Sequence, residues 1–318
     1  HHRSSAASDV YKRQAVERLH RAINCNEKIL VYGDYDVDGT TAVSLMYLFL
    51  KEKCKHVEYY IPDRYDEGYG VSYQGIDYAK RNNFSLIICL DCGIKAVEKV
   101  AYARNKDVDF IICDHHRPGD TLPLAVAVLD PKRSDCDYPF KELCGCGVGF
   151  KLAQAYHQQY NLPFEDLVPL LDLVVVSIAA DIVPMIDENR VLSFYGLQQL
   201  NTSPRIGLKA LMDVASRKNS FSITDVVFSL APRINAAGRI EHGNKAVELL
   251  VQQDFSIAKE KADYIDNHNF SRKELDKSIT REALAMIVQG ANSTVVCNEK
   301  WHKGCLLYTS PSPRDTLL

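Results

Sequence analysis

The sequence has no long apolar run and no excess of positive charge. None of its apolar stretches approaches the ~18 consecutive residues that a membrane-spanning helix needs, and no secretory signal is visible at its start. Its 38 Lys and Arg residues face 41 Asp and Glu residues, which gives a formal net charge of -3. We therefore expect no membrane partner, and we expect any nucleic acid to bind through a local basic patch or bound metal.

The ten cysteines are scattered along the chain rather than spaced as a disulfide framework. Cys89 and Cys113 lie inside apolar segments that we expect to be strands, which is typical of reduced, buried thiols. We therefore expect a cytoplasmic protein. Cys136, Cys144 and Cys146 lie close together, but a CxC spacing without a nearby second pair is weak evidence for zinc.

Composition and length indicate a globular chain of about two domains, with 46% hydrophobic and 25% charged residues. Residues 1–14 and 305–318 lack helical or strand periodicity and join the rest of the pattern abruptly. They resemble translated sequencing-adapter DNA, so we interpret both as non-native tails and leave them out of the fold prediction.

Short apolar segments alternate with helical segments in the first half of the chain. We expect strands at 28–33, 56–61, 86–90, 110–113 and 126–129, and helices at 39–53, 73–82 and 95–105. Apolar strands that alternate with helices predict an α/β fold with a parallel sheet flanked by helices. The second half is more helical, with helices at 147–160, 167–180 and 188–215, a loop at 229–243, a charged helix from 245 to 288 and a strand at 294–297.

Acidic residues and histidines follow several of the expected strands. They are Asp34, Asp36 and Asp38, then Asp91, then Asp114, His115 and His116, and Asp181 ends an apolar helix. In parallel sheets the ligand site lies outside the carboxyl ends of the strands, so these side chains should meet at one edge. Three aspartates within five residues repel one another unless a cation shares them.

Carboxylates with one histidine are ligands that suit Mn²⁺ or Mg²⁺. The set Asp34, Asp36, Asp38, Asp91, His115 and Asp181 predicts two such ions, with Asp91 as the bridge. Two ions of this kind assist displacement at phosphorus. We expect His116 to face the substrate phosphate, and Arg233, Asn235 and Arg239 to supply further donors.

Each feature also has an ordinary interpretation: an acidic turn, surface histidines, a helix terminus or surface ion pairs. Because all these features are expected at one edge of one sheet, we favour a metal site over a set of unrelated ordinary features.

Five motifs in order resemble the RecJ-type single-stranded-DNA-specific exonucleases of the DHH phosphoesterase superfamily. They are GDYDVDG (33–39), LDCG (90–93), CDHH (113–116), SIAADIVP (177–184) and PRINAAGR (232–239). The resemblance implies that the aspartates and His115 bind Mn²⁺ or Mg²⁺, that Asp91, Asp114, His115 and His116 are catalytic, and that His116 and the RINAAGR segment contact phosphate. It also implies removal of nucleotides from the 5′ end of single-stranded DNA in repair and recombination, by a monomer that works with a single-strand-binding protein or a helicase.

The same resemblance divides the chain into a DHH domain at 15–243, a connector helix at 244–290 and the start of a truncated DHHA1 domain at 291–304. Tyr32 stands where many members of the superfamily carry a metal-binding histidine, which leaves open which of the three clustered aspartates are ligands. Cys144 and Cys146 replace small residues, and we interpret them as packing variants.

Two other functions remain open at this point. One is a related phosphoesterase that cleaves short oligonucleotides, cyclic dinucleotides or pyrophosphate. The other is a nucleic-acid-binding scaffold of the same fold, although the chain keeps all the candidate metal ligands.

Overall fold

The centre of the molecule is a parallel sheet of five strands. This computed structural model describes residues 6–215, 220–240, 242–287 and 294–301. The strands are β1 (Ile29–Gly33), β2 (Val57–Tyr60), β3 (Leu86–Leu90), β4 (Asp109–Cys113) and β5 (Ala127–Leu129), in the order β2-β1-β3-β4-β5. The predicted α/β fold with a buried parallel sheet is confirmed.

The central strands are apolar throughout because both faces of the sheet are covered. Along β1, Ile29 and Val31 point into one hydrophobic core, whereas Leu30 and Tyr32 point into the other. Strand β1 pairs with β3 from Ile29 opposite Leu86 to Gly33 opposite Leu90. The two strands therefore end level, which places the residues that follow them side by side.

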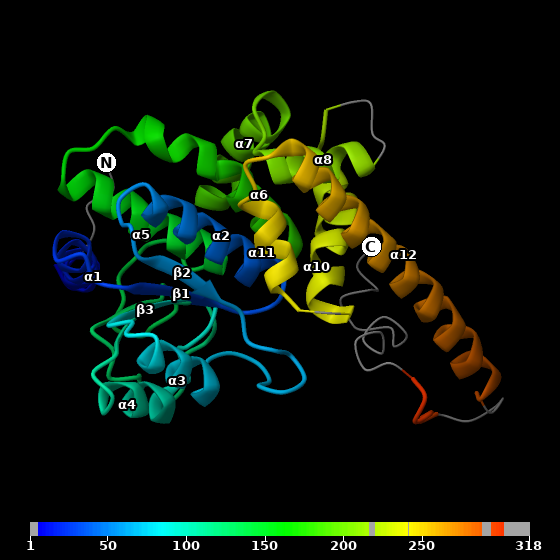
Figure 1. The fold of residues 1–318 in the computed structure, drawn as a ribbon, viewed down its shortest axis with the longest axis horizontal. Helices are drawn as coiled ribbons and strands as arrows, with labels where there is room; N and C mark the ends of the chain where they lie inside the picture. The colour runs from blue at the N-terminus through cyan, green and yellow to red at the C-terminus, as the bar shows by residue number, and fades with distance from the viewer. Residues whose placement is uncertain (1–5, 216–219, 241, 288–293, 302–318) are drawn as a thin grey trace.

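Helices cover the two faces of the sheet (Figure 1). On one face lie α3 (Tyr73–Arg81) and α4 (Val97–Arg104). On the other lie α2 (Val37–Lys51) and α5 (Gly145–Gln159), with α6 (Leu171–Asp181) packed on both. Helix α1 (Ala6–Asn24) packs beside α5 and β5, and it begins inside the segment 1–14 that was interpreted as a tail.

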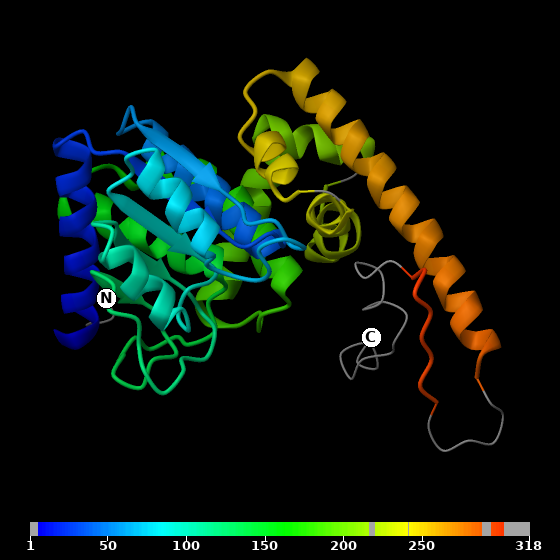
Figure 2. The same cartoon turned by 60° about the horizontal axis from the view of Figure 1, so that its bottom comes forward.

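The second half of the chain is helical, as predicted. Its elements are η1 (Phe164–Leu170), α7 (Asp187–Thr202), α8 (Ile206–Val214), α9 (Ile223–Asp225), η2 (Val226–Leu230), α10 (Ala231–Ile240), α11 (Asn244–Leu250) and α12 (Phe255–Ala285). Figure 2 shows α12 projecting away from the sheet layers. Within the described residues, no helix combines the length and apolar character required to cross a bilayer.

Three details of the prediction are wrong. The loop expected at 229–243 is largely helical, in η2 and α10, because Ile234, Ala236 and Ala237 are buried on a face that packs on α12. The helix expected at 244–290 is two helices, and Asp254 caps the second by accepting a bond from the backbone N–H of Ile257. Residues 294–297 form no strand, since no other strand lies beside them in the described chain. Residues 305–318 lie outside the described residues.

Candidate metal centre

The loop after β1 is a tight turn that leads directly into α2. Asp36 caps α2, and its carboxylate accepts a 2.9 Å bond from the backbone N–H of Gly39. A side chain at position 39 would place its Cβ only 2.8 Å from Cα of Asp34, so the turn requires glycine there. This turn directs Asp34 and Asp38, both buried, towards the carboxyl edge of the sheet.

His115 lies at the centre of the acidic residues. Its Nε2 is 3.1 Å from Oδ1 of Asp91 and 3.6 Å from Oδ2 of Asp38, and its Nδ1 is 3.8 Å from Oδ2 of Asp181. The possible ligand atoms of Asp38, His115 and Asp181 all lie within 4.8 Å of one another, as do those of Asp91, His115 and His116. The structure therefore brings together residues from four segments of the chain, as the sheet topology predicts.

The carboxylates of this cluster are crowded and poorly hydrated. Burial, reinforced by the charge of Asp36, raises the pKa of Asp34 to about 8. Burial and the charge of Asp38 raise the pKa of Asp36, and they raise that of Asp91 well above its usual value. The pKa of Asp181 rises to about 7 for the same two reasons. Carboxylates crowded together in this way are the expected surroundings of a divalent cation.

The donor set fits such a cation. Within the described chain, Oδ1 of Asp34, Oδ1 of Asp91 and Nδ1 of His115 are buried and make no hydrogen bond. Burial lowers the pKa of His115, which favours the neutral imidazole that a metal needs. Buried acceptors left without donors are costly, and oxygen and imidazole ligands match Mn²⁺ or Mg²⁺.

Asp114 serves the two histidines rather than the centre of the cluster. Its carboxylate accepts bonds from the backbone N–H groups of His115 (2.7 Å), His116 (3.1 Å) and Ile94 (2.9 Å). It also lies 2.7 Å from Nδ1 of His116, and this contact raises the pKa of His116. The Nε2 atom of His116 is 3.2 Å from the hydroxyl of Tyr69. Asp114 thus fixes the orientation of His116.

The predicted phosphate-binding residues lie on α10. A side chain at Gly238 would collide with the backbone of Tyr35, so α10 packs directly against the acidic turn. Arg233, however, forms a 2.8 Å ion pair with Asp266 of α12 and donates to the carbonyl of Ser229. Arg239 is buried, with 8% of its surface exposed. Asn235 is half-buried. In this arrangement Arg233 is engaged away from the cluster.

Comparison with known proteins identifies the fold and the family of the chain. A profile of the N-terminal domain of the DHH family matches residues 28–178. A crystal structure of exonuclease RecJ bound to manganese superposes with a TM-score of 0.86 and 30% sequence identity, over 94% of this chain and 76% of that one. The chain belongs to the RecJ-type DHH family.

Curated members of the RecJ-type family are longer than this chain. The single-stranded-DNA-specific exonuclease RecJ of Bacillus subtilis is 43% identical over 92% of the chain, which spans 37% of that protein. RecJ of Escherichia coli is 34% identical over 92% of the chain, which spans 54% of it. The chain therefore covers between about a third and a half of these relatives.

Three residues beside the cluster were not predicted from the sequence. Tyr69 contacts His116, and the glycine-containing segment DEGYG (66–70) around it was the available signal. Asp130 follows β5, is buried, and has an Oδ2 atom with no hydrogen bond in the described chain, while burial raises its pKa to about 7. Asp130 directly follows a strand, as Asp91 does, so the reasoning that identified Asp91 could have identified Asp130 as well. Ser177 contacts Asp38 from α6, and no sequence signal pointed to that bond.

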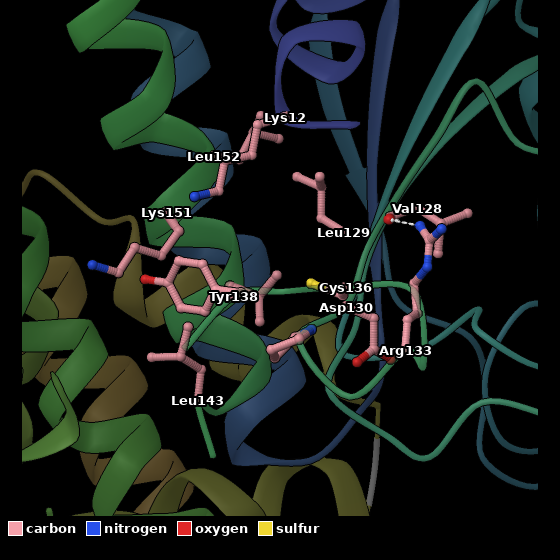
Figure 3. Close-up of a pocket in the computed structure, with 12 residues that line it drawn as sticks. Lys12, Val128, Leu129, Asp130, Arg133, Cys136, Tyr138, Leu143, Lys151 and Leu152 are labelled. Carbon is pink, nitrogen blue, oxygen red and sulfur yellow. Dashed lines mark hydrogen bonds between the residues drawn. The ribbon is translucent and has the colours of Figure 1, made fainter. Parts of the chain in front are cut away.

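An apolar pocket between β5 and α5 is separate from this cluster (Figure 3). Leu129, Tyr138 and Leu152 line it, and Arg133 on its side donates to the carbonyl of Val128. Its volume of about 50 Å³ is small, and none of the predicted site residues lines it.

Proposed function

We propose that this chain is the catalytic core of a metal-dependent exonuclease that removes nucleotides from the 5′ end of single-stranded DNA, in repair and recombination. The observation that carries the proposal is the cluster of buried carboxylates around His115 in a chain of the RecJ-type family. Relatives bearing the name single-stranded-DNA-specific exonuclease support the choice of substrate.

The proposed ligands of two Mn²⁺ or Mg²⁺ ions are the acidic residues of the cluster and one histidine, with Asp91 shared between the ions. These ligands are Asp34, Asp36, Asp38, Asp91, His115 and Asp181. When bound, the ions supply positive charge that polarises a phosphodiester and an attacking water. A manganese-bound RecJ structure and the unpartnered acceptors of the cluster support this assignment.

His116 is proposed to donate a hydrogen bond to the substrate phosphate. Its side chain is 44% exposed, whereas that of Asp114, which orients it, is 1% exposed. A positioned, protonated imidazole is a suitable donor to a phosphate oxygen. Asn235 and Arg239 on α10 are proposed to hold the phosphates further along the strand, and Arg233 would have to leave Asp266 to join them.

The proposal is tested by incubating the chain and Mn²⁺ with single strands labelled at the 5′ or the 3′ end, and with dinucleotides. We expect the 5′ label to appear at once as mononucleotide, while strands labelled at the 3′ end shorten progressively. Release of mononucleotide from dinucleotides alone would instead favour a small-substrate phosphoesterase. Binding without cleavage would favour the scaffold function.

A substitution of Asp91 tests the site itself. Asp91→Ala is expected to reduce cleavage by at least about 10³-fold, because it removes the shared carboxylate. Asp107→Ala is the matched control, since Asp107 has the same backbone φ of 57° but an exposed side chain. Equal activity of the two variants would contradict the assignment.

We further propose that residues 15–243 form the catalytic domain, that α12 is the connector, and that the protein is a cytoplasmic monomer. Its proposed partners are a single-strand-binding protein or a helicase. The buried free thiols support a reducing compartment. Analytical ultracentrifugation with and without single-stranded DNA tests the monomer, because a dimer would sediment faster in both conditions.

A further inference from the structure

We propose that Ser177 and the N-terminus of α5 together position Asp38, so that only its Oδ2 atom is available to a cation. The inference rests on the proposed metal-dependent function. It concerns residues that bind no substrate themselves but hold Asp38, a proposed metal ligand, in place.

The first turn of α5 binds the carboxylate of Asp38 directly. The backbone N–H of Gly145 donates to Oδ2 and that of Cys146 donates to Oδ1, each over 2.7 Å. These N–H groups have no partners within their own helix, and the dipole of a 15-residue helix favours an anion at this end. The start of α5 therefore fixes the position of Asp38.

Ser177 on α6 supplies the third donor and is fully buried. Its hydroxyl lies 2.6 Å from Oδ1 of Asp38 and 2.9 Å from Sγ of Cys144. The single hydroxyl proton goes to the carboxylate, because a bond to a charged acceptor is the stronger one. The Sγ atom of Cys144 lies beside this hydroxyl and accepts a 3.3 Å bond from the backbone N–H of Gly147, so Cys144 does more than fill space.

The three bonds are distributed unequally between the two carboxylate oxygens of Asp38. Oδ1 accepts from both Cys146 and Ser177, so its two lone-pair positions are occupied. Among the described residues, Oδ2 accepts a bond from Gly145 alone, and it faces Nε2 of His115 at 3.6 Å. A cation shared with His115 would therefore meet Oδ2, while the three bonds hold the carboxylate in place.

The same turn of α5 also contacts Asp91. A Cβ at Gly145 would lie 2.6 Å from Cβ of Asp91 and 2.7 Å from its Oδ1. The absence of a side chain lets the helix end approach both carboxylates at once. The start of α5 is thus a common support for Asp38 and Asp91.

Mn²⁺ affinity, measured by calorimetry and by the spectrum of free Mn²⁺ in electron paramagnetic resonance, tests the inference. Ser177→Ala should weaken Mn²⁺ binding by about 10- to 100-fold, the usual effect of removing a residue that orients a ligand. Ser177→Thr keeps the hydroxyl and should restore most of the affinity. Ser44→Ala is the matched control, because Ser44 is equally buried but donates to a backbone carbonyl within α2.

The outcomes separate the two proposals. Wild-type affinity in a folded Ser177→Ala variant would overturn the positioning role while leaving the metal site intact. If Ser177→Ala does not fold, loss of affinity in a folded Ser177→Thr variant equally overturns it, because the hydroxyl is still present. Failure of the wild-type chain to bind Mn²⁺ would overturn the metal-dependent function, and this inference with it.

Discussion

Ile182 directly follows Asp181 and has a left-handed backbone, with a φ of 55°. A β-branched residue in this conformation is an outlier, and it costs roughly 1–2 kcal/mol relative to the right-handed region. The position ends α6, where glycine is the usual residue. Strain of this kind is often retained at functional sites.

Ile182→Gly should therefore stabilise the protein by about 0.5–1 kcal/mol, the strain relieved less the entropy that glycine loses on folding. Urea unfolding without metal measures the change. Val191→Gly is the control, because Val191 is also exposed and β-branched but lies inside α7, where the backbone is right-handed. This control variant should have an unfolding free energy about 0.5–1 kcal/mol lower than that of the wild-type protein. Loss of stability in both variants would refute the presence of strain at position 182.

At the residue scale, the sequence predicted that Asp38, Asp91, His115 and Asp181 come together, but not how each is held, nor that Arg233 pairs with Asp266 instead. Asp91 and His115 were found because each follows an apolar strand of one parallel sheet, and the topology then brings them together. The bond from Ser177 to Asp38 spans 139 residues and joins two helices. No local pattern encodes such a contact, so it emerges only from tertiary packing.

At the scale of elements, strands were predictable and α10 was not. Each strand carries its own continuous apolar run, which marks it locally. The RINAAGR segment contains alanine, glycine and polar residues and resembles a loop, but packing on α12 and on the acidic turn stabilises it as a helix. Tertiary contacts there override the local pattern.

The approach of α5 to the cluster gives a prediction at this scale. Gly145→Ala would force Cβ to within 2.6 Å of Asp91, so the helix end or the carboxylate must shift. We expect a loss of about 1–3 kcal/mol in stability and weaker Mn²⁺ binding. Gly119→Ala should change neither quantity, because nothing lies within 4 Å of its Cβ position. Unaltered metal affinity in Gly145→Ala would argue against α5 as a support.

The junction of α6 and α8 depends on a buried ion pair. Asp172 is fully buried, and its carboxylate accepts two bonds from the guanidinium of Arg205 and one from the backbone N–H of the same residue. Asp172→Ala should cost about 3–5 kcal/mol in unfolding free energy, because it leaves the arginine without its partner. Glu274→Ala, at an exposed pair with Lys277, should cost at most about 0.5 kcal/mol. Similar losses in the two variants would contradict this account.

At the scale of the whole molecule, the layered arrangement follows from the sheet. Two cores lie on its opposite faces, and the chain returns from the second half to place α10 against the acidic turn after β1. The α/β class and the sheet edge where the acidic residues and His115 gather were predictable, because they depend on strand order and polarity alone. The break between α11 and α12 was not, since both helices continue the same charged pattern.

Acid stability depends in part on the contacts that hold α1 to the sheet. Burial alone would raise the pKa of Glu27, but its bonds to Ser85 and Arg18 outweigh burial and lower it. A lowered folded-state pKa stabilises the protein above the ordinary pKa of glutamate, and this contribution is lost as the pH falls through the folded value. Glu27→Gln should therefore cost about 1–2 kcal/mol at pH 7 and much less near pH 3. The unfolding free energies of the variant and the wild-type protein are compared by urea unfolding at pH 3 and pH 7. If they differ by the same amount at both, the ionisation of Glu27 does not contribute to stability.

Anomalous diffraction from crystals grown with Mn²⁺ tests the central proposal most directly. We expect two peaks at the carboxyl edge of the sheet, both in contact with Asp91, with His115 and Oδ2 of Asp38 among the other ligands. The absence of any peak at this edge, or peaks bound only elsewhere on the molecule, would contradict it.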